Sequence, residues 1–123
     1  MDDAAKHKLW NRVDWITGSS IDPDVVADIY RRCRGKRTMV ILDSDHSADH
    51  VGSELDAYAD LVAPGSYMIA QDGFVSDLDP AHGPGLREAI EKFFERDRRF
   101  QSDPSREPML FTFNPLGFLR GIR

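Results

Sequence analysis

The sequence is poor in cysteine and has no long apolar run. Its single cysteine, Cys33, allows neither an internal disulfide nor a cysteine-rich zinc site. No apolar stretch approaches the length that crosses a bilayer, so we expect no membrane partner. The first residues, Met1 to Ala5, are acidic and lack an apolar core, so no signal peptide is predicted and a cytoplasmic location is expected.

Positive charge is also scarce. The net charge of −5 argues against nucleic acid as a partner, because phosphate binding needs a basic surface. The basic run from Arg31 to Arg37 straddles the predicted end of a helix, where cations complement the helix dipole. With 41% hydrophobic and 30% charged residues, the 123-residue chain has the composition of one globular domain.

Hydrophobic periodicity and turn signals divide the chain into strands and helices. We expect a flexible segment at 1–11 and a single domain at 12–123. The expected strands cover 12–17, 38–42, 66–70, 109–113 and 118–122; the expected helices cover 22–34, 47–63 and 85–100. This alternation predicts an α/β fold, a Rossmann-like three-layer sandwich whose sheet is mostly parallel and ends in an antiparallel hairpin about residues 114–117.

The strand at 38–42 is an unbroken apolar run, so we expect it to be buried on both faces. Asp43, Asp45 and His46 follow it, and Asp72 follows the next strand. Ligands in such sheets bind at the carboxyl ends of strands. Two neighbouring carboxylates repel each other unless a cation or a proton lies between them. Two interpretations stay open at this point: a Mg²⁺ site, or aspartates that cap the segments after them.

Several motifs in this region, and one near the C-terminus, carry a family resemblance. They are the run from Ile41 to His46, Glu54-Leu55, the run from Pro64 to Tyr67, Gln71-Asp72, and the run from Leu110 to Leu119. Together, from about residue 12 to the end, they resemble the C-terminal half of the cephalosporin hydroxylase family, which has a class I S-adenosylmethionine-dependent methyltransferase fold. More loosely, the chain is similar to catechol-type O-methyltransferases.

The resemblance implies a set of site residues. The loop Gly18, Ser19, Ser20, Ile21 and Asp22, together with Asp43, would contact S-adenosylmethionine. Asp43 and Asp72 would bind Mg²⁺, and Gln71 stands where these families usually have a third carboxylate ligand. His46 falls where the catechol-type enzymes place a lysine base, and histidine can serve as a base because its ordinary pKa is near 6.5. An exposed loop histidine is the alternative reading of His46.

The sequence also has no Gly-x-Gly turn between a strand and a helix near its start. The resemblance therefore predicts a partial methyltransferase fold without the N-terminal strands that grip the cofactor. We expect the strand at 12–17 to pair directly with the strand at 38–42. The alternatives are self-association into a homo-oligomer, or docking of a complementing N-terminal half along that edge.

Three functions follow from these observations. The first is a Mg²⁺-assisted, S-adenosylmethionine-dependent O-methyltransferase that acts on a small-molecule hydroxyl, of a sugar or a secondary metabolite, when complemented. The second is a non-catalytic remnant or binding module of the same fold. The third, a hydroxylase of antibiotic biosynthesis, is weaker because no two-histidine-one-carboxylate iron pattern is evident.

Overall fold

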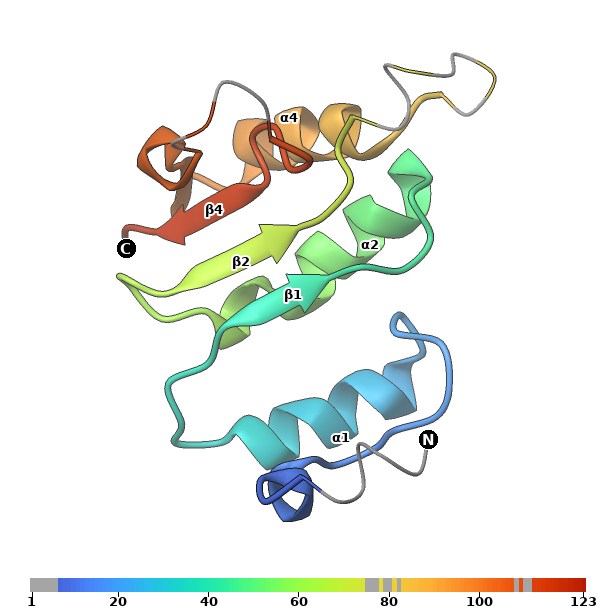
Figure 1. The fold of residues 1–123 in the computed structure, drawn as a ribbon, viewed down its shortest axis with the longest axis vertical. Helices are drawn as coiled ribbons and strands as arrows, with labels where there is room; N and C mark the ends of the chain where they lie inside the picture. The colour runs from blue at the N-terminus through green and yellow to red at the C-terminus, as the bar shows by residue number, and fades with distance from the viewer. Residues whose placement is uncertain (1–6, 75–77, 79–80, 82, 108, 110–111) are drawn as a thin grey trace.

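The computed structural model describes residues 7–74, 78, 81, 83–107, 109 and 112–123. Within these residues, three α-helices and four strands form the fold (Figure 1). The helices are α1 (Pro23–Cys33), α2 (Ala48–Tyr58) and α4 (Leu86–Arg96). The strands are β1 (Val40–Leu42), β2 (Tyr67–Ala70), β3 (Phe100–Ser102) and β4 (Phe118–Gly121). Short 3-10 turns cover Trp10–Arg12, Ala59–Leu61 and Pro104–Arg106. No helix among these residues is long and apolar enough to cross a membrane.

The four strands form one mixed sheet in the order β1-β2-β4-β3. β1 and β2 are parallel, with Leu42 opposite Ala70. β4 is antiparallel to both of its neighbours, β2 and β3. The α/β class is confirmed, but the prediction of a mostly parallel sheet is wrong, because only the β1–β2 pair is parallel. The C-terminal segment enters the middle of the sheet instead of extending its edge.

The predicted hairpin is also wrong in its pairing. β4 pairs with β2 and with β3 at Phe100–Ser102, and β3 begins at the last residue of the helix expected at 85–100. α4 ends earlier, at Arg96, because Asp97 leaves the helical conformation with φ −120° and ψ 97°. Residues 110 and 111 of the expected partner strand at 109–113 lie outside the described part of the chain, while Thr112 and Phe113 are not in a strand.

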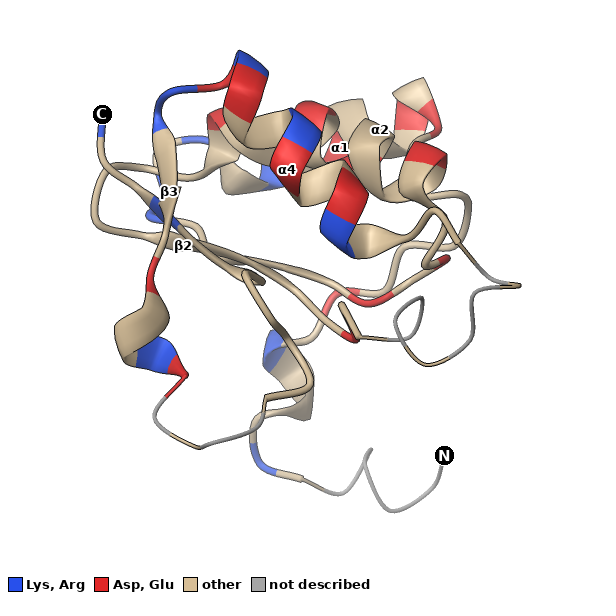
Figure 2. Cartoon of the chain, turned by 90° about the horizontal axis from the view of Figure 1, so that it is seen from above, with Lys and Arg blue, Asp and Glu red and all other residues tan. Residues whose placement is uncertain are grey.

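The three helices lie on one side of the sheet (Figure 2); α2 and α4 cover it, while α1 lies beyond β1, past the edge of the sheet (Figure 1). α2 and α4 pack on each other and on the sheet around a core whose fully buried large side chains are Leu55, Met68, Ile90, Phe93 and Leu119. Within the described residues the fold therefore has two layers, and the second helix layer of the expected sandwich is not among them. The opposite face of β1 is open, with Met39 57% and Ile41 53% exposed. Burial of β1 on both faces was thus a wrong prediction.

The segment expected as the first strand is not one. Residues 10–12 form a 3-10 turn, and residues 13–17 have no regular structure. Trp15 is 71% and Val13 46% exposed. A strand needs a neighbour for its main-chain groups, and this segment does not pair with β1. The expected direct pairing is therefore wrong, and β1 is an edge strand among the described strands. The flexible segment predicted at 1–11 lies largely outside the described residues.

Candidate active site

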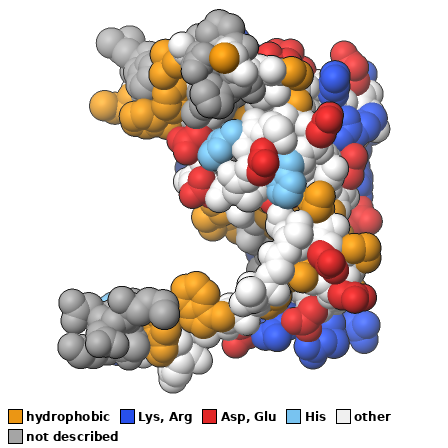
Figure 3. Space-filling model, turned by 90° about the vertical axis from the view of Figure 1, so that its right-hand side faces the viewer, with side chains coloured by type: hydrophobic (Ala, Val, Ile, Leu, Met, Phe, Trp, Pro, Cys, Tyr) orange, Lys and Arg blue, Asp and Glu red, His pale blue; other side chains and the backbone are white. Residues whose placement is uncertain are grey.

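Three titratable side chains converge where β1 and β2 end. His46 Nε2 lies 4.0 Å from Asp43 Oδ1 and 3.5 Å from Asp72 Oδ2. The ligand-type atoms of all three residues lie within 4.8 Å of one another. Figure 3 looks onto this end of the molecule, where histidine and acidic side chains gather. Because the parallel β1–β2 pair brings two carboxyl ends to one edge, residues far apart in sequence form this cluster.

Local backbone geometry fixes Asp72 in the cluster. Asp72 has a φ of 61°, in the left-handed region that non-glycine residues seldom adopt, and such strain concentrates at functional sites. Its N–H donates to Asn114 Oδ1 at 3.1 Å, which holds the turn in place. Asp45 points elsewhere. Its Oδ1 accepts from the Ser47 N–H at 2.7 Å at the start of α2, and this bond lowers the pKa of the Asp45 carboxyl.

Gln71 lies beside this cluster but continues the sheet. Its N–H donates to the Leu42 carbonyl at 3.0 Å, which extends the β1–β2 ladder by one bond. The side chain is half-buried. Its expected role as a third metal ligand stays a prediction.

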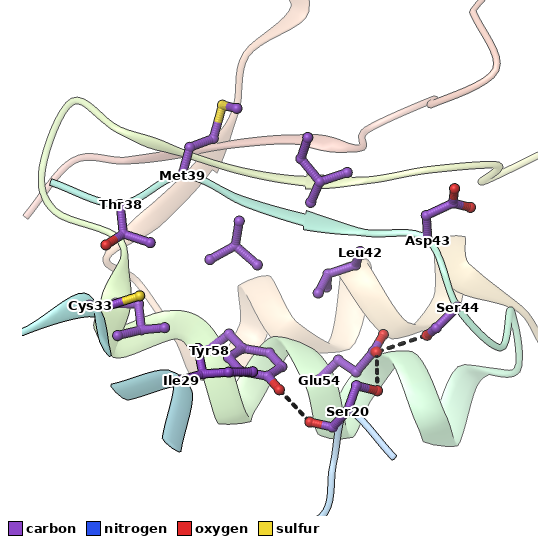
Figure 4. Close-up of a pocket in the computed structure, with 13 residues that line it drawn as sticks. Ser20, Ile29, Cys33, Thr38, Met39, Leu42, Asp43, Ser44, Glu54 and Tyr58 are labelled. Atoms are coloured by element: carbon purple, nitrogen blue, oxygen red, sulfur yellow. Dashed lines mark hydrogen bonds between the residues drawn. The ribbon is translucent and has the colours of Figure 1, made fainter. Parts of the chain in front are cut away.

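A second polar cluster is centred on Glu54, a residue of α2 that is only 2% exposed. Its Oε1 accepts from Ser20 Oγ at 2.5 Å and from Ser44 Oγ at 2.8 Å (Figure 4). The same Oε1 lies 3.5 Å from His50 Nε2. The Tyr58 hydroxyl donates to the Ser20 carbonyl, and burial raises the pKa of this tyrosine. One buried carboxylate thus ties α2 to the loop before α1 and to the end of β1.

Ser20, His50 and Glu54 resemble a nucleophile relay in composition but not in geometry. Ser20 Oγ lies 3.2 Å from His50 Nε2, and Glu54 approaches that same nitrogen. In a working relay the acid holds the other ring nitrogen, so that the histidine can take a proton from the serine. The cluster therefore serves to hold the loop.

The predicted cofactor loop, residues 18–22, is held closely against α1 and α2. Gly18 has a φ of 144°, and a Cβ at this position would lie 2.9 Å from Val25 Cγ2, so glycine is required. Asp22 caps α1, accepting from the Asp24 N–H at 2.8 Å, as the sequence predicted. Ser20 faces Glu54, while Ser19 and Ile21 are exposed. Contact of this loop with a cofactor stays a prediction.

A groove of about 450 Å³ runs along β1 on its helix side (Figure 4). We call it the β1 groove. It is lined by Ile29 and Cys33 from α1, Val40 and Leu42 from β1, and Glu54 and Tyr58 from α2. Ser20, Ser44 and Asp43 also line it, so the groove reaches the carboxyl end of β1 and connects the two polar clusters.

Sequence reasoning missed Glu54 as a site residue. A signal was present: Val51, Leu55 and Tyr58 form the apolar stripe of α2, and residue 54 falls on the same stripe. A carboxylate at a position that faces the core requires hydrogen-bond donors nearby, which here are Ser20 and Ser44.

Comparison with known proteins places the chain in a family. The family model Rhamnosyl O-methyltransferase/CmcI matches residues 2–122. The chain belongs to this family. This match confirms the resemblance to the cephalosporin hydroxylase family as family membership. The restriction to a C-terminal half and the likeness to catechol-type enzymes stay predictions.

Curated relatives include rhamnosyl O-methyltransferases of mycobacteria. Those of Mycobacterium tuberculosis (strain H37Rv) and Mycobacterium bovis (strain BCG) are each 35% identical over 114 residues, covering 85% of this chain and 45% of the relative. That of Mycobacterium leprae is 33% identical over 102 residues, covering 76% and 44%. The chain thus spans about half the length of the curated relatives it matches. No solved structure gave a significant match.

Proposed function

We propose that this chain forms the part of an O-methyltransferase that binds the metal ion and the methyl acceptor, and that the acceptor is the hydroxyl of a small molecule such as a sugar. The observation that supports this most is the convergence of Asp43, His46 and Asp72 at one end of the sheet. The family and the name of the mycobacterial relatives support O-methyl transfer as the reaction class. S-adenosylmethionine is the methyl donor that this class of reaction implies.

The donor atoms of the cluster fit a divalent cation. Two carboxylates, one from each strand end, face the same histidine nitrogen, and His46 Nε2 is buried without a hydrogen-bond partner. A cation between these groups would relieve the repulsion of the carboxylates. We assign Mg²⁺ to Asp43 and Asp72, with Gln71 as the third side chain, because Mg²⁺ prefers oxygen ligands. When bound, Mg²⁺ would orient the acceptor hydroxyl and lower its pKa.

His46 is then available as the base. Imidazole suits zinc, copper and iron better than Mg²⁺, so the histidine remains free to take the proton from the acceptor hydroxyl. Asp72 at 3.5 Å would stabilise the imidazolium that forms. Within the described residues one histidine, not two, approaches the acidic pair, which does not favour the iron-dependent hydroxylase alternative.

For the cofactor, the loop at 18–22 and the end of β1 offer a surface. Ser20 and Ser44 are both fixed by Glu54 and both line the β1 groove. In this proposal they lie beside the adenosyl part of S-adenosylmethionine, with Asp43 close to its reacting end. The other groups that grip the cofactor would come from the part of the relatives that has no counterpart in these 123 residues.

The open edge of β1 supports the second candidate, a binding module without activity of its own.

Methyl transfer from radiolabelled S-adenosylmethionine to a rhamnoside tests the proposed enzyme against the binding module. It uses this chain alone and this chain mixed with the part of the Mycobacterium tuberculosis relative outside the matched region. We expect activity only in the mixture, and a decrease of about 100-fold or more with His46→Ala. The same variant should change the affinity for Mg²⁺ by less than about threefold, since the metal ligands are oxygen atoms. A mixture without methyl transfer would favour the binding module.

We also expect isolated chain to bind S-adenosylmethionine weakly or not at all, with a Kd above about 1 mM, that is, less than about 4 kcal/mol of binding free energy. Only the 18–22 loop and the end of β1 are available to contact the cofactor. Isothermal titration calorimetry measures this directly. A micromolar Kd would show that the described residues already contain the cofactor site.

A further inference from the structure

The backbone that carries Asp43 is held on both sides of this residue. Before it, the Leu42 carbonyl accepts from the Gln71 N–H at 3.0 Å, a bond that extends the β1–β2 ladder. After it, the Ser44 hydroxyl donates to Glu54 Oε1 at 2.8 Å. The Asp43 side chain itself is 58% exposed. Because so little packs on this side chain, the place of its carboxylate depends on the two bonds that bracket its backbone.

Asp72 is held in a similar way at the end of the neighbouring strand. The residue before it, Gln71, makes the ladder bond to Leu42, and the Asp72 N–H donates to Asn114 Oδ1 at 3.1 Å. The φ of Asp72 is 61°, a conformation that persists in a residue other than glycine only where its surroundings enforce it. Asn114 supplies part of that enforcement, because its side chain reaches the strained residue from the loop before β4.

The turn that carries Asn114 is itself anchored on β2. The Asn114 N–H donates to Thr112 Oγ1 at 3.1 Å, and the Asn114 carbonyl accepts from the Gly117 N–H at 2.9 Å. The Gly117 carbonyl accepts from the Ala70 N–H at 2.9 Å, and a Cβ at Gly117 would clash with the Ala70 carbonyl. Since Ala70 lies two residues before Asp72, the acceptor and the residue that it holds are fixed to the same strand.

Glu54 provides a comparable fixed point for the other carboxylate. It is 2% exposed on the core-facing side of α2, and its Oε1 also accepts from Ser20 Oγ at 2.5 Å. Within the described residues Oε2 has no hydrogen-bond partner, so Oε1 carries both serine bonds. Glu54 is not a member of the group formed by Asp43, His46 and Asp72. It acts on that group through the serine that follows Asp43.

We infer that Glu54 and Asn114 are positioning residues of the metal site. Glu54 holds Asp43 in place through Ser44. Asn114 holds Asp72 in place through the Asp72 N–H. This inference deepens the proposed function, on which it rests for the cation. Mg²⁺ demands near-ideal ligand geometry, and loss of the partners that orient metal ligands lowers affinity by about 10- to 100-fold.

Calorimetric titration of Mg²⁺ or Mn²⁺ into this chain, without cofactor, tests the role of Glu54. Ser44→Ala removes one serine bond at an exposed position and should weaken binding of the cation about tenfold or more. Ser20→Ala removes the other bond to the same oxygen and should change the affinity less than about threefold. Glu54→Gln keeps a side-chain oxygen that can accept both bonds, so its affinity should also stay within about threefold.

A second matched pair tests the role of Asn114. Asn114→Ala removes the acceptor, whereas Asn114→Asp keeps an oxygen in the same place. We expect the alanine variant to weaken binding of the cation about tenfold or more, and the aspartate variant not to weaken it. In the cation-free chain, hydrogen exchange at the Asp72 amide should quicken about tenfold or more with Asn114→Ala, because this N–H loses its partner. Asn114→Asp should change that exchange less than about threefold.

The outcomes separate this inference from the proposed function. If the unmodified chain binds the cation and Ser44→Ala and Asn114→Ala bind it equally well, the inference fails while the metal site stands. A loss with Glu54→Gln as large as that with Ser44→Ala would assign the effect to charge, and an equal loss with Ser20→Ala would assign it to general loosening; either result overturns the role of Glu54. An unmodified chain that binds neither cation would contradict the metal in the proposed function, and this inference with it. Circular dichroism checks the fold of each variant, and if Asn114→Ala does not fold, the exposed Ser44→Ala decides.

Discussion

Replacing Asp43 and Asp72 together by asparagine should weaken binding of Mg²⁺ or Mn²⁺ by about 100-fold or more. The two carboxylates supply the negative charge of the cluster, and an amide oxygen retains the shape but not the charge. Loss of groups that merely support metal ligands already lowers metal affinity by about 10- to 100-fold. Loss of two charged ligands should therefore lower the affinity by about 100-fold or more. Titration calorimetry of the unmodified chain and of the double variant measures the difference.

Asp45→Asn is the matched control for this prediction. Asp45 lies two residues from Asp43 and carries the same charge, but its carboxylate is bonded to the Ser47 N–H. The control should therefore bind the cation within about threefold of the unmodified chain, because it removes a charge that is not among the proposed ligands. Equal heats from the unmodified chain and the double variant would show that the cluster binds no cation and would remove the metal from the proposed function.

Phe93→Ala should lower the free energy of unfolding by about 3–5 kcal/mol, the usual range for a large aromatic side chain in a core. Phe93 is 0% exposed and lies between α4 and the sheet, with its ring centroid 5.4 Å from that of Phe100 on β3. The substitution leaves a cavity that the packed helices cannot close. Urea denaturation followed by circular dichroism gives the change.

Phe94, the next residue of the same helix, provides the comparison. It is half-buried at the rim of the core, so Phe94→Ala should cost less than about half as much. Small domains are marginally stable, so Phe93→Ala could unfold the chain. Phe93→Leu removes less volume and should lower the free energy of unfolding by less, so that this variant remains folded. Equal losses at positions 93 and 94 would contradict the core described above.

The helices could be predicted because local signals suffice for them. Asp22 and Pro23 mark the start of α1, and the stripe of Val51, Leu55 and Tyr58 marks α2. The meeting of Asp43 and Asp72 was predictable for a related reason. Both residues follow apolar strands joined by one helix, and such strands end at the same edge.

Strand pairing depends on partners distant in sequence, and there the predictions failed. Residues 13–17 alternate like a strand but have no neighbour. Phe100 continues the apolar pattern of the helix expected at 85–100, yet residues 100–102 pair with β4 because Asp97 ends the helix before them. Exposure of Ile41 could not be read from its apolar neighbours, since it depends on what covers the sheet.

The contacts of Ser20 have a consequence for the energy of binding. Its side chain is bonded to Glu54 and its carbonyl to Tyr58, so α2 helps to fix the loop before α1. All of these bonds lie within the chain itself, so the loop is ordered before any ligand arrives. The conformational entropy of the loop is then not lost again when a ligand enters the β1 groove, so most of the ordering cost of binding falls on the ligand.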